Sequence, residues 1–172
     1  MLPNLIIPYL CYTAQVISKV PRSNADDVAK AVAAANAAFP SWSRLSYKER
    51  AVYLDKIADE IEKDIDRLAA LESMDTGKPL SLARSLDIPR AVENFRFYAG
   101  AVRHEATDCH MTGGSISADV NDPANTAALN YTHRYAAGVG GIITPWNLPL
   151  YLLTFKAAAA LGCGCTLVVK PS

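Results

Sequence analysis

Two polar side chains with different chemistry stand at the ends of two apolar segments in the last third of this sequence. Asn147 follows the apolar residues 139–144, and Lys170 follows the apolar residues 165–169. An asparagine side chain donates hydrogen bonds through its NH₂ group, and a lysine ammonium can reach a phosphate or the hydroxyls of a ribose. The two residues can form one binding site only if the chain brings the ends of both segments together.

The pattern of residues 138–172 predicts that arrangement, because it is typical of a strand, a helix and a second parallel strand. Residues 139–144 are apolar and β-branched, as in a strand buried in a parallel sheet. Residues 165–169 form a second segment of this kind. Functional groups of such a unit collect at the carboxyl ends of its strands, where Trp146, Asn147 and Lys170 stand.

The connecting helix is expected over residues 148–161. Asn147 is a favoured N-cap residue, and Pro149 is tolerated in the first helical turn. Gly162 and Gly164 are expected to adopt positive φ angles and to end the helix.

Lys156 lies within this apolar helix. A lysine in such surroundings must find a partner, shift its pKa or extend its ammonium to solvent.

Composition limits the classes of function. The 172 residues are 51% hydrophobic and carry 17 basic and 17 acidic side chains, so nothing favours nucleic acid or an anionic membrane as a partner. Residues 148–169 are apolar enough to resemble a membrane span, but Lys156 and the two glycines favour a buried helix followed by a strand. No signal peptide and no disulfide or metal spacing is evident, so a reduced cytoplasmic setting is expected.

Three helices are expected before this unit. The first covers residues 23–39, with Ser23 as its cap. The second covers residues 46–74 as one amphipathic helix, with Asp59 and Lys63 as an i,i+4 ion pair. The third starts at Asp87, and its predicted apolar stripe consists of Ile88, Val92, Phe95, Ala99 and Val102.

The second helix is predicted to carry its own apolar face and to stop at a glycine. That face consists of Tyr47, Leu54, Ile57, Ile61, Ile65, Leu68 and Leu71. Gly77 followed by Pro79 is a helix-stop signal.

Residues 104–127 are polar and contain turn signals, which predicts a loop or an exposed hairpin. His104, Asp108, Cys109 and His110 lie there, but their spacing lacks a second ligand pair and disfavours a metal site. In residues 128–136, bulky apolar or ring side chains occupy every second position, which predicts a strand with these side chains on one face.

The motifs P-W-N at residues 145–147 and K-P-S at residues 170–172, with Asn147 and Lys170 separated by 23 positions, resemble the aldehyde dehydrogenase superfamily. The phrases DTGKPL at residues 75–80 and DIPRAVENFRFYAG at residues 87–100 support this resemblance. It covers residues 14–172, with a poorer fit over residues 107–127. The phrase NLPLYLLTFK from Asn147 onward is similar to muconic-semialdehyde-type members, including the 2-hydroxymuconic and 2-aminomuconic semialdehyde dehydrogenases.

The resemblance implies an α/β fold. The chain would be the N-terminal part of a doubly wound cofactor domain, with a helical front followed by a first βαβ unit. Residues 14–172 would be an incomplete dinucleotide-binding domain, residues 128–136 an oligomerisation strand, and the catalytic domain would be absent. Residues 1–13 are atypical of the family and suggest a truncated or misassigned start.

The resemblance also implies oxidation of an aldehyde to a carboxylic acid with NAD, NADP not being excluded. Asn147 would donate to the oxyanion, and Lys156 would pair with a distant glutamate in a proton relay. Lys78 would sit in a structural corner and is given no chemical role. The residues implied to contact the cofactor are Ile143, Thr144, Pro145, Trp146, Asn147, Lys170, Pro171 and Ser172.

The family's nucleophilic cysteine and general-base glutamate would lie beyond residue 172, and Cys163 and Cys165 are expected to be packing residues instead. We therefore expect the chain alone to be inactive, and aldehyde-dependent NADH formation by it would refute this. Two readings stay open. In the first, the full-length protein is an enzyme that acts as a homo-oligomer on a small aldehyde. In the second, the chain is a non-catalytic truncated product that associates with other subunits.

Overall fold

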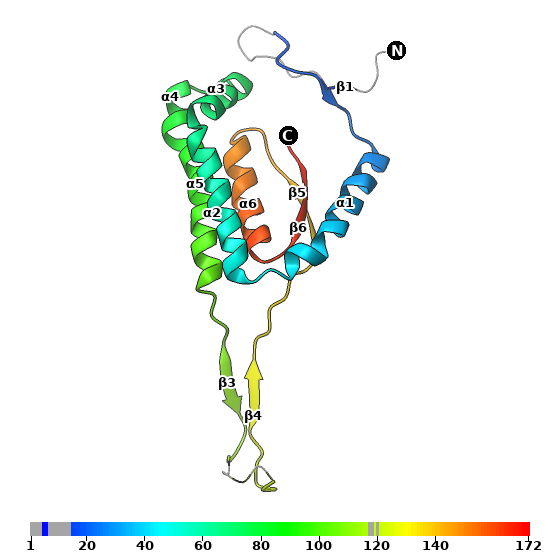
Figure 1. Ribbon diagram of the computed structural model, residues 1–172, viewed down its shortest axis with the longest axis vertical. Helices are drawn as coiled ribbons and strands as arrows, with labels where there is room; N and C mark the ends of the chain where they lie inside the picture. Colours follow the sequence, from blue (N-terminus) through cyan, green and yellow to red (C-terminus); the bar gives the residue numbers. More distant parts are fainter. Residues whose placement is uncertain (1–4, 7–14, 117–118, 120) are drawn as a thin grey trace. The chain divides into compact units, whose positions relative to one another are not determined.

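Helix α6 (Pro149–Gly162) lies between a pair of parallel strands and the helices α2 (Tyr47–Lys63) and α5 (Ile88–Arg103) in this computed structural model (Figure 1). The structure describes residues 5–6, 15–116, 119 and 121–172. The described residues form two units, one within residues 1–103 and 136–172 and the other within residues 104–135.

The predicted βαβ unit is confirmed. Strand β5 (Val139–Ile143) and strand β6 (Thr166–Lys170) run parallel, and Ile143 pairs with Lys170 at their carboxyl ends. Among the described residues these two strands form a sheet of two, so they are less buried than their composition indicates. Ile143, for example, is 74% exposed.

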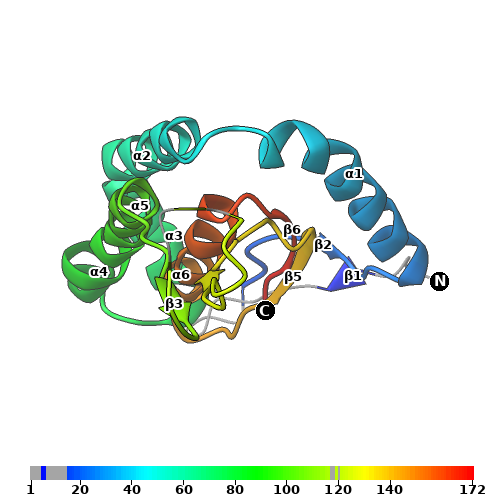
Figure 2. The ribbon, with the colours of Figure 1, turned by 90° about the horizontal axis from the view of Figure 1, so that it is seen from below.

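Two helices flank the strand pair, α6 on one side and α1 (Ala25–Ser43) on the other, in both Figure 1 and Figure 2. The predicted cap of α1 is wrong by one residue. Asn24, not Ser23, accepts hydrogen bonds from the backbone N–H groups of Asp26 and Asp27, and the Asp27 carboxylate accepts from the Asn24 backbone N–H in return. The helix also continues four residues past the predicted end at Phe39, with Pro40 inside its last turns.

The predicted single helix over residues 46–74 is two helices. Ser46 caps α2 in a capping box with Glu49, as a helix start at this position requires. Asp64 then leaves the helical conformation, with φ −111° and ψ 18°, and α3 (Ile65–Thr76) begins after it. Gly77 ends α3 with φ 78°, which confirms the predicted glycine stop.

The predicted helix start at Asp87 is also wrong. A helical segment begins at α4 (Leu80–Leu82) and runs through the π-helical turn η1 (Ala83–Asp87) into α5. In η1 the Ile88 backbone N–H donates to the Ala83 carbonyl, five residues back. Pro89 has no N–H to give, so a widened turn ahead of it lets the helix continue. Asp87 is consequently buried within the helix instead of capping it.

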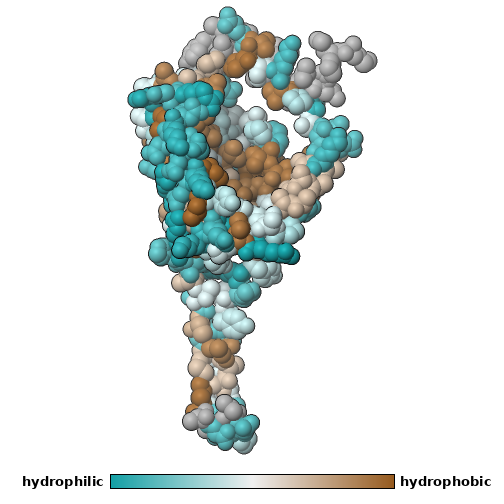
Figure 3. Space-filling view, viewed as in Figure 1, coloured by the Kyte–Doolittle hydropathy of each residue, from teal (hydrophilic) through white to brown (hydrophobic). Residues whose placement is uncertain are grey.

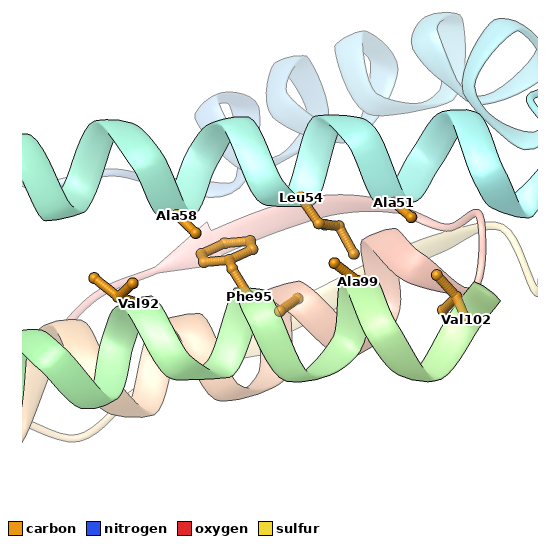
Figure 4. Close-up of a cluster of buried hydrophobic side chains, with 8 residues drawn as sticks. Ala51, Leu54, Ala58, Val92, Phe95, Ala99 and Val102 are labelled. Atoms are coloured by element: carbon orange, nitrogen blue, oxygen red, sulfur yellow. The ribbon is translucent and has the colours of Figure 1, made fainter. Parts of the chain in front are cut away.

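The core of the first unit lies where α2, α5 and α6 meet (Figure 4). All five residues of the apolar stripe predicted for α5 are buried, so that prediction is confirmed. On α2 and α3 the prediction holds in part, because Tyr47 is 41% and Leu71 44% exposed while small alanines fill their expected places. The buried cluster consists of Ala51, Leu54, Ala58, Val92, Phe95, Ala99, Val102 and Ala158.

Gly162 and Gly164 have different roles at the end of α6. Gly164 adopts φ 87°, as predicted, but Gly162 is the last helical residue and is not among the glycines with positive φ. Gly162 is buried, and a Cβ atom at this position would lie 2.9 Å from Cγ1 of Val102. The absence of a side chain at position 162 therefore allows α6 to approach α5 closely.

Polar side chains from the preceding helices hold the backbone of α6. The Arg50 guanidinium is buried and donates to the Gly162 carbonyl at 2.8 Å and to the Leu45 carbonyl. The Trp42 indole N–H donates to the Leu161 carbonyl at 3.1 Å. Asn94 donates to the Tyr151 carbonyl at 3.1 Å and to the Thr154 hydroxyl at 3.0 Å.

The ion pairs on the outer face of α2 differ from the predicted Asp59–Lys63 pair. Lys63 pairs with Glu60 at 2.7 Å, and Asp59 pairs with Arg96 of α5 at 2.5 Å. A spacing of three residues lies on the same helix face as a spacing of four, and the arginine reaches across from the neighbouring helix.

The second unit confirms the hairpin alternative for residues 104–127. Strand β3 (Cys109–Thr112) pairs antiparallel with β4 (Ala128–Tyr131), and both strands are exposed. The strand predicted over residues 128–136 is regular only in its first four residues.

The remaining regular elements are two short strands near the amino end of the chain. In the first unit, strands β1 (Leu5–Ile6) and β2 (Val20–Pro21) form a short antiparallel pair. No helix of the described residues is long and apolar enough to cross a membrane.

We predict that Gly162→Ala destabilises the chain by about 1–3 kcal/mol, the usual cost of overpacking a well-packed core. The new methyl group would meet the stiff, buried side chain of Val102 at 2.9 Å, and the gain in helix propensity at the end of α6 does not offset that contact. The measurement is the free energy of unfolding from urea denaturation.

Gly100→Ala is the matched control. Gly100 lies inside α5, and a Cβ atom there has no atom within 4 Å outside its own helix backbone. This variant should be stabilised by about 0.5–1 kcal/mol, because alanine loses less backbone entropy in a helix. Equal effects of both substitutions would show that α6 does not pack as closely as described.

Candidate active site

The two sequence segments predicted to form a site leave the sheet at the same edge. β5 and β6 are parallel, with Ile143 paired to Lys170, and the Thr144 backbone N–H donates to the Lys170 carbonyl at 3.3 Å. Residues 144–147 and residues 170–172 therefore begin as neighbours. The structure thus brings Asn147 and Lys170 to one end of the strand pair, on chain segments that start side by side.

Most of the predicted cofactor-contacting residues are exposed at this edge. Ile143 and Trp146 are 74% and 70% exposed. Thr144 differs, since it is 4% exposed and its backbone N–H is bonded within the sheet. The other exposed residues at this edge are Pro145, Asn147, Lys170, Pro171 and Ser172.

Asn147 does not cap α6, so that prediction is wrong. The N-cap is Leu148, with φ −139° and ψ 68°, and among the described residues no side chain caps this helix. Pro149 occupies the first helical turn and forces the residue before it out of the helical region, which places the cap one residue later than predicted. The Asn147 side chain is exposed and makes no hydrogen bond to another described residue. Its NH₂ group is therefore available to an added molecule.

Lys156 finds a partner on the same edge. Its ammonium donates to the Ile143 carbonyl at 3.2 Å, and its side chain lies on the exposed side of α6. Of the alternatives open for this lysine, a backbone partner beside solvent is the one observed. The contact joins the middle of α6 to the last residue of β5.

Lys78 contacts this site, although no sequence pattern indicates that it belongs there. Its ammonium lies 2.7 Å from the Glu72 carboxylate, 2.5 Å from the Asp87 carboxylate and 3.2 Å from the backbone carbonyl of Asn147. The side chains of Lys78, Glu72 and Asp87 are 11%, 4% and 2% exposed. No local sequence pattern indicates the contact with Asn147, which lies 69 positions away.

The charge of Lys78 is secure at neutral pH. Burial lowers the pKa of its ammonium, but hydrogen bonds and charge interactions with Asp87 and Glu72 outweigh burial and raise the pKa above the usual 10.5. Because the pKa of Lys78 is raised in the folded state, its ammonium stabilises the fold. This contribution is fully present below pH 10.5 and is lost as the pH rises through the folded-state pKa. At neutral pH Lys78 therefore acts as a charged donor.

An apolar groove lies elsewhere on the same unit (Figure 3). Its volume is about 870 Å³, and α1, α2, α6 and β6 line it with side chains such as Trp42, Leu153 and Leu167. None of the predicted cofactor-contacting residues lines this groove. The groove reaches Val169, the residue before Lys170, but not the predicted cofactor-contacting residues themselves.

Metal-binding chemistry finds no support in the part of the chain that the structure describes. No group of three or more His, Cys, Asp or Glu side chains there could hold a metal ion. The chemistry that the site offers is hydrogen-bond donation by the Asn147 amide and by the Lys170 ammonium.

Comparison with known proteins connects this arrangement to a family. Residues 6–172 match the sequence profile of the aldehyde dehydrogenase family. The chain is 44% identical over 160 residues to 2-aminomuconic semialdehyde dehydrogenase of Homo sapiens, covering 93% of this chain and 31% of that protein. It is 42% identical over 159 residues to 2-hydroxymuconic semialdehyde dehydrogenase of Pseudomonas sp. strain CF600, covering 92% of this chain and 31% of that protein.

A solved structure agrees with these relatives. The NAD⁺ complex of aldehyde dehydrogenase from Bacillus cereus superposes with a TM-score of 0.84 at 38% identity, covering 97% of this chain and 32% of that chain. The predicted fold, a helical front followed by a βαβ unit as in the N-terminal part of such enzymes, is confirmed. The predicted similarity to muconic-semialdehyde-type members is confirmed as well. The chain spans about one third of the length of these proteins.

Proposed function

Because the chain belongs to the aldehyde dehydrogenase family, we propose that it supplies the oxyanion-stabilising amide and part of the cofactor site of an enzyme that oxidises an aldehyde to a carboxylic acid. One observation carries this proposal. Asn147 presents an exposed side-chain amide just past the carboxyl end of β5, and that end is paired with the end of β6 at Lys170.

Asn147 has the chemistry that aldehyde oxidation needs at the carbonyl oxygen. When a nucleophile adds to an aldehyde, negative charge develops on that oxygen, and an oriented N–H donor stabilises it. The Asn147 NH₂ group supplies such a donor. It is not used for helix capping, so it loses no other hydrogen bond when it serves the substrate.

The exposed edge fits one end of a nicotinamide dinucleotide, which accepts a hydride when bound. The Lys170 ammonium is exposed at the end of β6 and would bind ribose hydroxyls or a phosphate. The apolar surfaces of Ile143 and Trp146 would contact the flat rings and exclude water from them. The other residues proposed for this contact are Thr144, through its backbone, Pro145, Pro171 and Ser172. NAD and NADP both satisfy this chemistry.

Lys156 has a narrower proposed role in this chain. Its hydrogen bond to the Ile143 carbonyl holds the end of β5, which leads directly into the segment that carries Asn147. A proton relay with a distant glutamate stays a prediction of the family resemblance.

The proposed substrate is an aldehyde, and the muconic semialdehydes that name two of the relatives are the first compounds to test. The family resemblance places the nucleophilic thiol and the general base in the part of the relatives that this chain does not cover. We therefore expect no aldehyde-dependent NADH formation by the 172-residue chain alone.

Assembly with other subunits is a second proposed function, in keeping with a homo-oligomeric enzyme. The hairpin of β3 and β4 exposes large side chains, among them Leu129 at 61% and Tyr131 at 70%. Apolar side chains on an open strand are suited to pairing with another chain. This role would not require catalysis by the chain itself.

We predict that Asn147→Ala lowers kcat by about 10²–10³, the usual cost of one lost oxyanion donor. The assay would use a full-length enzyme in which this chain replaces the matching segment of 2-aminomuconic semialdehyde dehydrogenase. Because the lost hydrogen bond acts on developing charge, KM for the aldehyde should change little. An unchanged kcat would remove Asn147 from the catalytic residues.

Asn36→Ala is the control for this variant. It removes an exposed asparagine amide from α1, away from the proposed site and from the hairpin of β3 and β4. Its kcat should equal that of the parent enzyme.

We predict that Lys170→Met weakens cofactor binding by roughly 10- to 100-fold, because a hydrogen bond to a charged group contributes about 1.5–3 kcal/mol. The kcat at saturating cofactor should stay the same. Titration of the same full-length enzyme with NAD and with NADP measures both dissociation constants. Lys48→Met, at an exposed lysine of α2, is the control, and equal losses in both variants would contradict the role of Lys170.

A further inference from the structure

The ammonium of Lys78 contacts oxygen atoms from three separate parts of the chain, of which the two carboxylates are buried and the Asn147 carbonyl is exposed. Glu72 comes from α3, Asp87 from η1, and the carbonyl of Asn147 from the segment before α6. The start of α6 lies at the same end of the helices as α3 and α4 (Figure 1). A lysine ammonium has three N–H donors, and these three oxygens match that number.

The two carboxylates alone would be enough to hold the turn between α3 and η1. They balance the charge of Lys78, whose side chain is only 11% exposed. The third contact has a different effect, because it leaves this turn and reaches the chain 69 positions later. A purely local role for Lys78 therefore leaves the contact with Asn147 unexplained.

A hydrogen bond to the Asn147 carbonyl restrains the direction of the Asn147 side chain. The carbonyl belongs to the rigid peptide plane between Asn147 and Leu148, so fixing it restricts the ψ angle of Asn147. On the far side of that plane, Leu148 is restricted by Pro149. The remaining freedom of the exposed amide lies in its own side-chain torsions.

We propose that Lys78 is a positioning residue for the Asn147 amide. Held by Glu72 and Asp87, it donates to the backbone carbonyl of Asn147 and orients that residue toward the reacting carbonyl oxygen. This inference rests on the proposed function of Asn147. It assigns to Lys78 an indirect role in the reaction, through the backbone of Asn147.

The first test is an NMR measurement of the Asn147 backbone carbonyl, and it requires no enzyme activity. In the 172-residue chain, ¹³C′-asparagine with ¹⁵N-leucine labels only the pairs Asn4–Leu5 and Asn147–Leu148, because no other asparagine precedes a leucine. Lys78→Met should move the Asn147 carbonyl resonance upfield, as expected for a lost hydrogen bond. Lys63→Met, which removes an exposed lysine–carboxylate contact of 2.7 Å, should leave it in place.

The second test separates positioning from stability. Lys78→Met alone leaves two buried carboxylates without a cation and is expected to destabilise the protein. The triple variant Lys78→Met, Glu72→Gln, Asp87→Asn removes those charges together with the ammonium. It should recover most of the lost stability, measured by urea denaturation, while the Asn147 carbonyl resonance stays displaced.

In the full-length enzyme described above, the triple variant should keep a kcat lowered by roughly 10- to 100-fold with a nearly unchanged KM, since misplacing a reacting group by about 1 Å can cost 10²-fold in rate. A kcat at the parent level in the triple variant would overturn the proposal, as would an unmoved Asn147 resonance in Lys78→Met. Failure of the proposed function would appear elsewhere, as an unchanged kcat in Asn147→Ala.

Discussion

The burial of α6 against α2 and α5 determines where the strand pair and the surrounding helices lie. The helix is almost wholly apolar, so it must be covered, and small residues such as Gly162 and Ala158 let it approach its neighbours closely. A buried helix also needs partners for the backbone groups at its ends. Arg50 and Trp42 donate to the carbonyls at the carboxyl end. Before the amino end, Lys78 donates to the carbonyl of Asn147, which lies outside the helix. Strand β5 leads into this helix through residues 144–148, and β6 begins after it at Thr166, so the packing of α6 also places the strand pair.

Much of this arrangement could be predicted because it follows from short-range chemistry. The apolar stripe of α5 is read from the 3.6-residue period, and the βαβ unit from two apolar segments joined by a helix of suitable length. The segments that carry Asn147 and Lys170 start at the same end of the strand pair because β5 and β6 are parallel. The errors arose where two local signals compete. Ser23 and Asn24 are both good caps, and only the backbone geometry selects Asn24.

Other features could not be predicted because their causes are distant in the sequence. Nothing at Asp64 resembles a helix stop, yet the chain turns there. Asp87 resembles a helix start, but a π-helical turn accommodates Pro89 and Asp87 pairs with Lys78 instead. Lys78 itself lies between Gly77 and Pro79, a setting typical of a turn, and its contact with Asn147 depends on how three separate helical segments pack.

The electrostatics of the Lys78 cluster explain how a cation can lie beside the start of a helix. The amino end of a helix carries a partial positive charge, so a lone ammonium near it is unfavourable. Here two carboxylates accompany one ammonium, and the group carries a net negative charge that suits this end of α6. At the other end a single cation, Arg50, faces the helix carbonyls, where a positive charge is favourable. A buried ion group adds little net stability compared with apolar packing of the same volume. We therefore attribute a mainly geometric effect to the Lys78 group, acting on the peptide plane that follows Asn147.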